Sequence, residues 1–238
     1  MTFEEVMKQL EKQGTAQARK TYARHGAGDK MFGVSSANLY KLQKQIKKDH
    51  TMARKLWQTC NLDAQWLATM IADPAMMNSR EADAWAKDSA HHEHLLGGHL
   101  AEVVARSECA DQKMRAWMKS KEEFTRASGY NLLGVRLKNH DASLTDDDCR
   151  QFLTTIEKEI HQSANRARYS MNGALIGIGI YRRSLTQEAL KAAERIGKVE
   201  VDHGETACQT PAAIPYIQKA LAKKRRQANR RPRPPDHG

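Results

Sequence analysis

The 238-residue chain lacks the marks of a membrane protein and of an exported protein. It has no apolar run long enough to cross a bilayer. Residues 1–14 carry acidic side chains, whereas a signal peptide begins basic and then turns apolar. The 4 cysteines are scattered, without the close pairs typical of a disulfide framework or a zinc site. We therefore expect a cytoplasmic protein with free thiols and with neither a metal nor a cofactor.

Acidic residues are in the minority, because 28 Asp and Glu against 39 Lys and Arg leave a net charge of +11. Such an excess indicates a polyanionic partner, most often a nucleic acid. The excess gathers near the C-terminus in seven basic side chains: Lys223, Lys224, Arg225, Arg226, Arg230, Arg231 and Arg233. No large apolar residue accompanies them, so we predict a disordered basic tail over residues 223–238 that contacts phosphates. The alternative is that the tail only aids solubility.

Strand signals are nearly absent, and almost every segment has the apolar periodicity of a helix. Thr2 and Glu5 form a capping box for the first helix, and Thr145 caps a later one. The helices pair at intervals of roughly 30–45 residues, the period range of helical solenoids, in which neighbouring pairs stack to bury their apolar faces. The sequence thus predicts an all-α solenoid in one domain over residues 1–222, with an irregular helical bundle as the alternative.

The few aromatic residues, 6% of the chain, include four tryptophans. These stand at helical spacing among apolar neighbours: Trp57, Trp66, Trp85 and Trp117. The pattern favours packing in the core over stacking on nucleic-acid bases.

Several stretches, in their order along the chain, resemble one protein family. They are Phe32–Ser35, Leu39–Leu42, Leu67–Pro74 and Glu122–Leu133, followed by Met171–Gly179. Together they resemble the DNA alkylation repair family, whose best-known members are AlkD-type alkylpurine DNA glycosylases. The resemblance covers roughly residues 1–222. It implies an all-α solenoid of HEAT-like repeats, curved into a C shape, that holds duplex DNA on its concave face.

The resemblance also implies a chemistry, which is N-glycosidic cleavage of cationic alkylated purines without flipping the base into a pocket. In active members two Trp side chains and an Asp pack against the sugar, in a Trp-x-x-x-Asp pattern, while an Arg holds the backbone. The matching stretch here, residues 88–98, contains no Trp, and Glu93 is the only acid within residues 91–98. The Arg position falls on or beside Ala127, and the second Trp position falls near Gly173.

None of the family's catalytic residues is therefore carried over. A carboxylate near the sugar would stabilise oxocarbenium-like charge or orient water. Glu93 is the candidate catalytic residue for this role, as a substitute for the missing Asp.

Four further cations are candidate DNA-binding residues. Arg166 and Arg168 stand at a predicted helix start, where exposed backbone donors also favour phosphate. Arg126 and Lys138 lie on inner helices of earlier repeats. The alternative for each is an ordinary solvated helix face.

Two polar clusters suggest other chemistry. His91, His92 and His94 could hold a metal or face DNA, which would make affinity depend on pH, but a surface role is favoured. Residues 202–208 hold an acid, a His and a Cys, yet their closeness in sequence favours a loop that caps the last helix. That helix is predicted to begin with Thr210 as N-cap and Pro211 at its first position.

The sequence thus favours a DNA-binding protein of the alkylation repair type that recognises damaged or distorted duplex DNA. Whether it also hydrolyses the N-glycosidic bond of alkylated purines stays open. A non-catalytic binder of DNA structures and a protein-interaction scaffold are the alternatives. We expect a monomer, associated with the nucleoid in the cytoplasm.

Overall fold

The structure is a computed structural model, and its described part covers residues 1–229. The side chains at a few positions in this range lie outside the description: His91, Glu93, His94, Ala228 and Asn229. Within it the secondary structure is entirely helical. The α-helices are α1 (Phe3–Gln13), α2 (Ala16–Arg24), α3 (Ser36–Ile46), α4 (His50–Gln58), α5 (Leu62–Ile71), α6 (Ser79–Asp88), α7 (Glu93–Val104), α8 (Ala110–Met118), α9 (Glu123–Lys138), α10 (Asp146–Glu159), α11 (Asn165–Tyr181), α12 (Thr186–Ile196) and α13 (Ala213–Asn229). Each helix of residues 1–229 is too short or too polar to cross a membrane.

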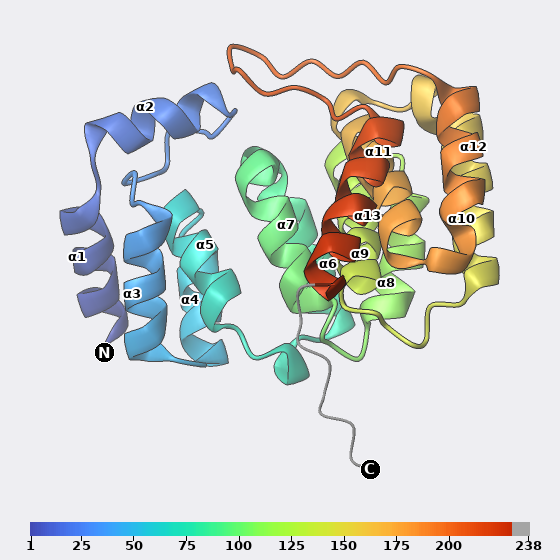
Figure 1. Ribbon diagram of the computed structural model, residues 1–238. Coiled ribbons are helices and arrows are strands. Elements are labelled where there is room, and N and C mark those ends of the chain that lie inside the picture. Colours follow the sequence, from blue (N-terminus) through green and yellow to red (C-terminus); the bar gives the residue numbers. More distant parts are fainter. Residues whose placement is uncertain (230–238) are drawn as a thin grey trace.

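The helices form two layers that follow the chain from the N-terminus to the C-terminus (Figure 1). Helices α3, α5, α7, α9, α11 and α13 contact one another in succession and form the inner layer. Helices α4, α6, α8, α10 and α12 each pack on the next inner helix and form the outer layer together with α1. The predicted all-α solenoid of helix pairs is confirmed, because each pair covers the apolar face of its neighbour.

Local signals set the helix starts where the sequence predicted them. The capping box of Thr2 and Glu5 is present in both directions, and Thr145 forms the same motif with Asp148. Each box satisfies two backbone N–H groups that the first turn of a helix leaves without partners.

The tryptophans pack in the core, as predicted. Trp57 and Trp85 stack with ring centroids 4.1 Å apart and 1° between their planes. The Nε1 of Trp117 donates to Asp83 at 2.8 Å, so this buried ring keeps a polar partner. Trp66 is only partly buried and packs against the edge of the core.

The C-terminal helix is longer than the sequence analysis expected. Helix α13 continues to Asn229, whereas the disordered tail was expected from residue 223. Its Lys, Arg, Gln and Ala residues are good helix formers, and after Pro215 in the first turn no Pro occurs before Pro232. Leu221, two residues before the expected boundary, packs against the core and holds this part of the helix in place. The rest of the tail, residues 230–238, lies outside the described residues.

A buried charge network ties α9 to its neighbours. The Arg136 side chain is 1% exposed and donates to Asp141 and Asp111, both at 2.7 Å, and to Ser143 at 2.8 Å. Burial raises the pKa of Asp141, but hydrogen bonds from Arg136 and Ser143 outweigh it and lower the pKa to about 2. The network therefore stabilises the fold as long as these carboxyl groups are ionised.

This network predicts part of the acid sensitivity of the fold. The pKa of Asp141 falls from 3.8 to about 2 on folding, so its stabilisation is complete above pH 3.8 and is lost as the pH falls towards 2. The loss amounts to about 2 kcal/mol. In urea unfolding between pH 5 and pH 2, Asp141→Asn should show a shallower fall in unfolding free energy than the wild type. Asp147→Asn, at an 84% exposed carboxylate, is the control and should keep the wild-type slope.

Candidate nucleic-acid interface

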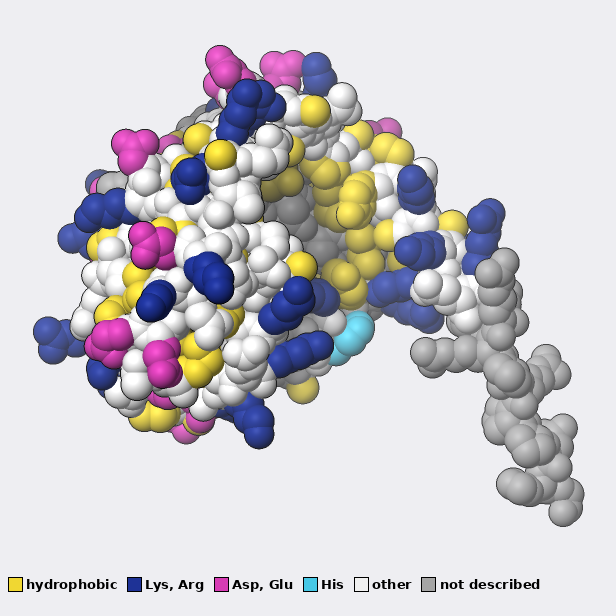
Figure 2. Space-filling model, turned by 90° about the vertical axis from the view of Figure 1, so that its left-hand side faces the viewer, with side chains coloured by type: hydrophobic (Ala, Val, Ile, Leu, Met, Phe, Trp, Pro, Cys, Tyr) yellow, Lys and Arg dark blue, Asp and Glu magenta, His cyan; other side chains and the backbone are white. Residues whose placement is uncertain are grey.

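A groove crosses the inner layer from Tyr40 on α3 to Ala174 on α11, and we call it the inner groove. Its volume is about 870 Å³, and α3, α5, α7, α9 and α11 all contribute to its lining. Seen from the N-terminal side, the molecule is hollowed, with hydrophobic side chains in the depth and Lys and Arg side chains along the edges (Figure 2). An apolar floor with cationic edges suits a polyanion that also presents flat, apolar surfaces.

The floor of the inner groove contains three glycines on neighbouring helices. Gly98 on α7, Gly134 on α9 and Gly173 on α11 all line it. A Cβ atom added to any of them would meet nothing within 4 Å outside its own helix. The backbone is therefore bare at these points, which lets a ligand approach the helices closely.

The charges in the inner groove centre on one ion pair between α7 and α9. Lys138 Nζ lies 3.1 Å from Glu102 Oε1, and the two side chains are 58% and 40% exposed. The Nε of Arg106, which also lines the groove, donates to the main-chain oxygen of Glu102 at 2.9 Å. Among the described lining residues Glu102 is the only carboxylate. A phosphate oxygen can take the place of a carboxylate oxygen beside an ammonium group, so this geometry is compatible with phosphate binding by Lys138, which stays a prediction.

One histidine of the groove is held neutral. The His99 ring packs against the Trp66 ring at an angle of 39°, with ring centroids 4.9 Å apart. Burial lowers the pKa of His99, and the charge of Glu102 opposes this only in part. The lowered pKa favours the uncharged form of the ring at neutral pH, and the ring forms part of the groove lining.

The structure places the other predicted cations differently. Arg126 pairs with Glu159 of α10. Arg166 is buried, and its guanidinium lies over the Tyr169 ring, 4.9 Å from the centroid. The main-chain N–H of Arg166 donates to Glu123 Oε1 at 2.6 Å, so a carboxylate occupies the start of α11 where phosphate was expected.

Arg168 contacts carbonyl oxygens instead of lying open to solvent. Its guanidinium donates to the main-chain oxygens of Glu200 and Ser163, both at 2.9 Å. These contacts tie α11 to the turn before it and to the segment after α12. Of the four cations predicted outside the tail, Arg126, Lys138, Arg166 and Arg168, only Lys138 lines the inner groove.

Residues 197–212 join α12 to α13 in a long segment without helix or strand, which we call the arm. Figure 1 shows it running across the upper end of the molecule and back. The side chain of Asn165 bonds the main chain of Asp202 in both directions, at 2.7 and 2.8 Å. Asn172 donates to the Pro211 oxygen at 2.9 Å. One face of α11 thus fixes the arm in place.

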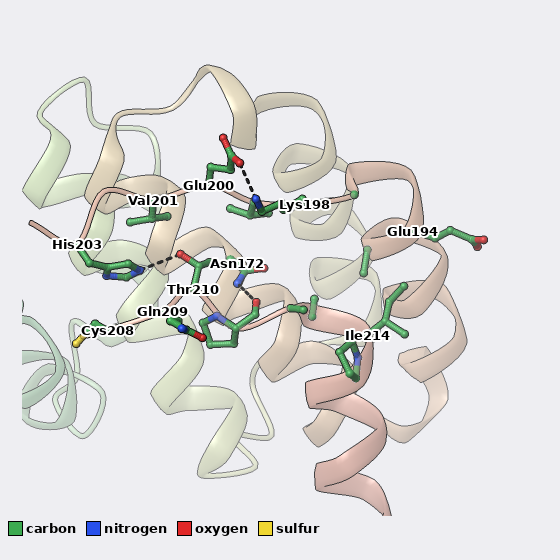
Figure 3. Close-up of a pocket in the computed structure, with 17 residues that line it drawn as sticks. Asn172, Glu194, Lys198, Glu200, Val201, His203, Cys208, Gln209, Thr210 and Ile214 are labelled. Carbon is green, nitrogen blue, oxygen red and sulfur yellow. Dashed lines mark hydrogen bonds and ion pairs between the residues drawn. The ribbon is translucent and has the colours of Figure 1, made fainter. Parts of the chain in front are cut away.

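A cavity of about 800 Å³ lies between the arm, α12 and the start of α13 (Figure 3). The Nε2 of His203 lies 2.9 Å from Thr210 Oγ1, and its ring meets the Tyr169 ring edge-on. The sulfur of Cys208 points away from the His203 ring (Figure 3). Among the described residues no hydrogen bond joins the side chains of Cys208 and His203, and the Nε2 of His203 bonds a hydroxyl instead. Helix α13 begins at Ala213, so Thr210 closes the arm and is not its N-cap.

The predicted tail cations are only partly described. On α13, Lys224 lies with its Nζ 4.2 Å from the centroid of the Tyr181 ring. Three others on this helix are exposed to solvent: Lys223, Arg225 and Arg226. Arg230 and Arg231 lie outside the described residues.

The predicted catalytic carboxylate also falls outside the description. Glu93 is the first residue of α7, but its side chain is not described, and neither are those of His91 and His94. Within the part of the chain that the structure describes, no three His, Cys, Asp or Glu side chains are close enough to hold a metal ion. Glu93 therefore stays a prediction from sequence.

Comparison with known proteins identifies the family. The family model described as DNA alkylation repair enzyme matches residues 6–217. The chain belongs to the DNA alkylation repair enzyme family. Uncharacterized protein Lmo0209 of Listeria monocytogenes is 28% identical over 224 residues, which are 92% of this chain and 97% of that protein. Uncharacterized protein Lin0241 of Listeria innocua is 27% identical over 224 residues, with the same coverage of each chain, 92% and 97%.

A solved structure with the same fold is described as belonging to a new family of proteins related to the HEAT-like repeat DNA glycosylases, with affinity for branched DNA structures. It superposes with a TM-score of 0.87 at 28% identity, covering 94% of this chain and 96% of its own. The HEAT-like repeat fold that the sequence resemblance implied is thus confirmed for this member of the family.

Sequence reasoning missed the glycines of the groove floor. Glycine within a helix costs about 1 kcal/mol relative to alanine, which is a signal that some packing or binding reason holds it there. Gly173 also lies where the family resemblance places the second tryptophan. In this chain that position is bare backbone with open space above it.

Proposed function

We propose that this member of the DNA alkylation repair enzyme family binds branched or distorted duplex DNA in the inner groove without cleaving the glycosidic bond. One observation carries the proposal: Gly98, Gly134 and Gly173 leave the groove floor bare, with Lys138 beside it. A bare floor has room for a DNA backbone but offers no side chain to act on a sugar.

The charges of the inner groove support binding over catalysis. Cleavage of an alkylpurine is helped by a carboxylate that faces the sugar. Glu102, the only carboxylate among the described residues of the lining, is paired with Lys138. It is better placed to balance a cation in the empty groove than to stabilise an oxocarbenium ion. The solved structure noted above, with its affinity for branched DNA structures, supports the same class of ligand.

DNA binding and base release together test this function. We expect the wild type to bind a four-way junction more tightly than a linear duplex, and to release neither 3-methyladenine nor 7-methylguanine from methylated DNA. Lys138→Gln should weaken binding roughly fivefold and flatten the salt dependence by about one phosphate contact. Glu102→Gln should strengthen binding by a similar factor, since Lys138 no longer has a competing carboxylate.

A matched control separates these effects from net charge. Glu157 on α10 pairs with Arg195 of the outer layer, at 2.6 Å. Glu157→Gln changes the net charge as Glu102→Gln does and should leave DNA affinity within twofold of the wild type. Release of alkylated base by the wild type, abolished in Glu93→Gln, would instead establish a glycosylase with a relocated carboxylate. Absence of salt-sensitive DNA binding would favour a protein-interaction scaffold. Action as a monomer at the nucleoid stays a prediction from sequence.

A further inference from the structure

Two cationic side chains and a histidine, from the ends of α9 and α11 and from α13, come together beside the inner groove. They surround a pocket of about 460 Å³ where α9 and α11 end against α13. His140 follows α9, Arg183 follows α11 and Lys224 comes from α13. We call these three residues the cation cluster.

The rings and the backbone hold the cation cluster in shape. Lys224 Nζ lies 4.2 Å from the centroid of Tyr181, a cation–π contact that fixes the ammonium group without neutralising it. His140 meets the same ring edge-on, with centroids 6.0 Å apart. The backbone of His140 has φ 54°, in the left-handed region that costs a non-glycine residue about 1 kcal/mol. Tyr181 therefore contacts two of the three side chains of the cluster.

Arg183 and Lys224, the two charged members of the cluster, have no anionic partner among the described residues. The helix ends gather positive charge, because the carbonyl end of a helix attracts cations. Arg182 donates to the main-chain oxygens of Asp141 and Leu144, so its guanidinium is already paired with carbonyl oxygens of the chain. Asp146, the only carboxylate among the described residues of the pocket, accepts from Ser184 at 2.5 Å. No hydrogen bond or ion pair of the described structure joins the side chain of His140, Arg183 or Lys224 to an acid.

The cation cluster continues the cationic edge of the inner groove. His140 stands two residues after Lys138, which lines the groove. In Figure 2, Lys and Arg side chains with a histidine among them follow the lower edge of the hollow. A backbone that leaves the groove at Lys138 therefore meets the cluster next.

We propose that the cation cluster is a second phosphate site, which binds the sugar–phosphate backbone of a second DNA arm leaving the inner groove. The proposal rests on the proposed function, because it assumes that a first arm lies in the groove. A guanidinium, an ammonium and an imidazole around one pocket supply the N–H donors that phosphodiester oxygens accept. A short linear duplex fills the groove alone, whereas a branched DNA fills both sites.

Arg183→Gln combined with Lys224→Gln tests this site in the full chain. The affinity for a four-way junction should fall about tenfold, and its salt dependence should flatten by about two phosphate contacts. The affinity for a 12-base-pair linear duplex should stay within twofold of the wild type. Each single variant should lower the affinity for the junction about threefold. Because the Arg183 side chain is exposed and that of Lys224 is half-buried, the variants should keep the fold.

The control is Lys191→Gln, an exposed lysine on the outer helix α12. It should leave both affinities unchanged, and an equal loss in the control would show that only net charge matters. Equal losses on junction and linear duplex would place the cluster in the first site, and no loss would exclude phosphate binding there. Free inorganic phosphate should compete with the linear duplex equally well in the wild type and in the double variant. On the junction, phosphate should compete differently in the two proteins. Equal competition on the junction would mean that the cluster binds no phosphate. A wild type that binds no DNA at all would instead refute the proposed function.

Discussion

Replacing Gly134 with phenylalanine should abolish most DNA binding while leaving the fold intact. The substituted side chain would project from the middle helix of the groove floor into the space above it, where an added Cβ meets nothing within 4 Å. A DNA backbone that lies on the floor would then be held several ångströms away from Lys138. Loss of the close contacts and of the phosphate pairing should lower affinity at least thirtyfold, or about 2 kcal/mol. Fluorescence anisotropy with a labelled four-way junction measures this loss.

The same site provides its own stability control. Glycine is a poor residue for a helix interior, so Gly134→Ala should raise the unfolding free energy by about 0.5–1 kcal/mol. A methyl group leaves most of the groove open, and DNA affinity should fall by no more than about threefold. Thr154→Phe, on the exposed face of the outer helix α10, adds the same ring elsewhere and should not change binding. If Gly134→Phe binds DNA like Thr154→Phe, the inner groove is not the DNA site.

Much of the fold could be predicted because its signals are local. The capping box at Thr2 and the cap at Thr145 depend on residues within one helical turn. The tryptophans could be assigned to the core from apolar neighbours on the same helix, and Trp57, Trp85 and Trp117 are only 2–3% exposed. Stacking of helix pairs follows from periodicity, since no single pair can bury its apolar stripe alone.

The roles of the charged residues could not be predicted, because their partners lie one repeat away. Arg126 pairs with Glu159, 33 residues later, and Lys138 pairs with Glu102, 36 residues earlier. Arg168 reaches the main chain of Glu200, 32 residues later. A sequence shows each charge but not the register between repeats, and that register decides whether an arginine is paired or open to a ligand.

The same argument explains why the groove floor was missed. Whether a helical glycine allows close packing against a neighbouring helix or exposes the backbone to a ligand depends on which face of the helix it occupies. Gly129 on α9 is in the first class, since a Cβ there would come within 2.5 Å of the Met118 backbone nitrogen. Gly134, five residues later on the same helix, is in the second class. What distinguishes Gly134 from Gly129 is the packing of α9 against α8 and α11, which the sequence alone does not show.

Asp63 should be the most important single carboxylate for the stability of the N-terminal half. It is fully buried, and its two oxygens accept the backbone N–H groups of Phe32, Gly33 and Val34 at 2.6, 2.9 and 2.7 Å. These three donors belong to the loop between α2 and α3, and no other hydrogen bond of the described residues satisfies them. Asp63→Ala should lower the unfolding free energy by about 4 kcal/mol, because it leaves three donors without a partner beside a new cavity.

Asp49→Ala provides the matched comparison for this prediction. Asp49 is the N-cap of α4 and accepts from one backbone N–H, that of Met52, at 2.8 Å. Its loss should cost about 1 kcal/mol, the usual value for a cap. In thermal unfolding the two variants should therefore differ by about 10 °C, given the usual relation between free energy and melting temperature in chains of this size. Equal shifts would contradict the assignment, because they would mean that Asp63 acts as one hydrogen bond and that the loop is held by its apolar contacts. Tyr22 of α2 donates to Val34 in the same loop, so Asp63→Ala should also speed hydrogen exchange in α2.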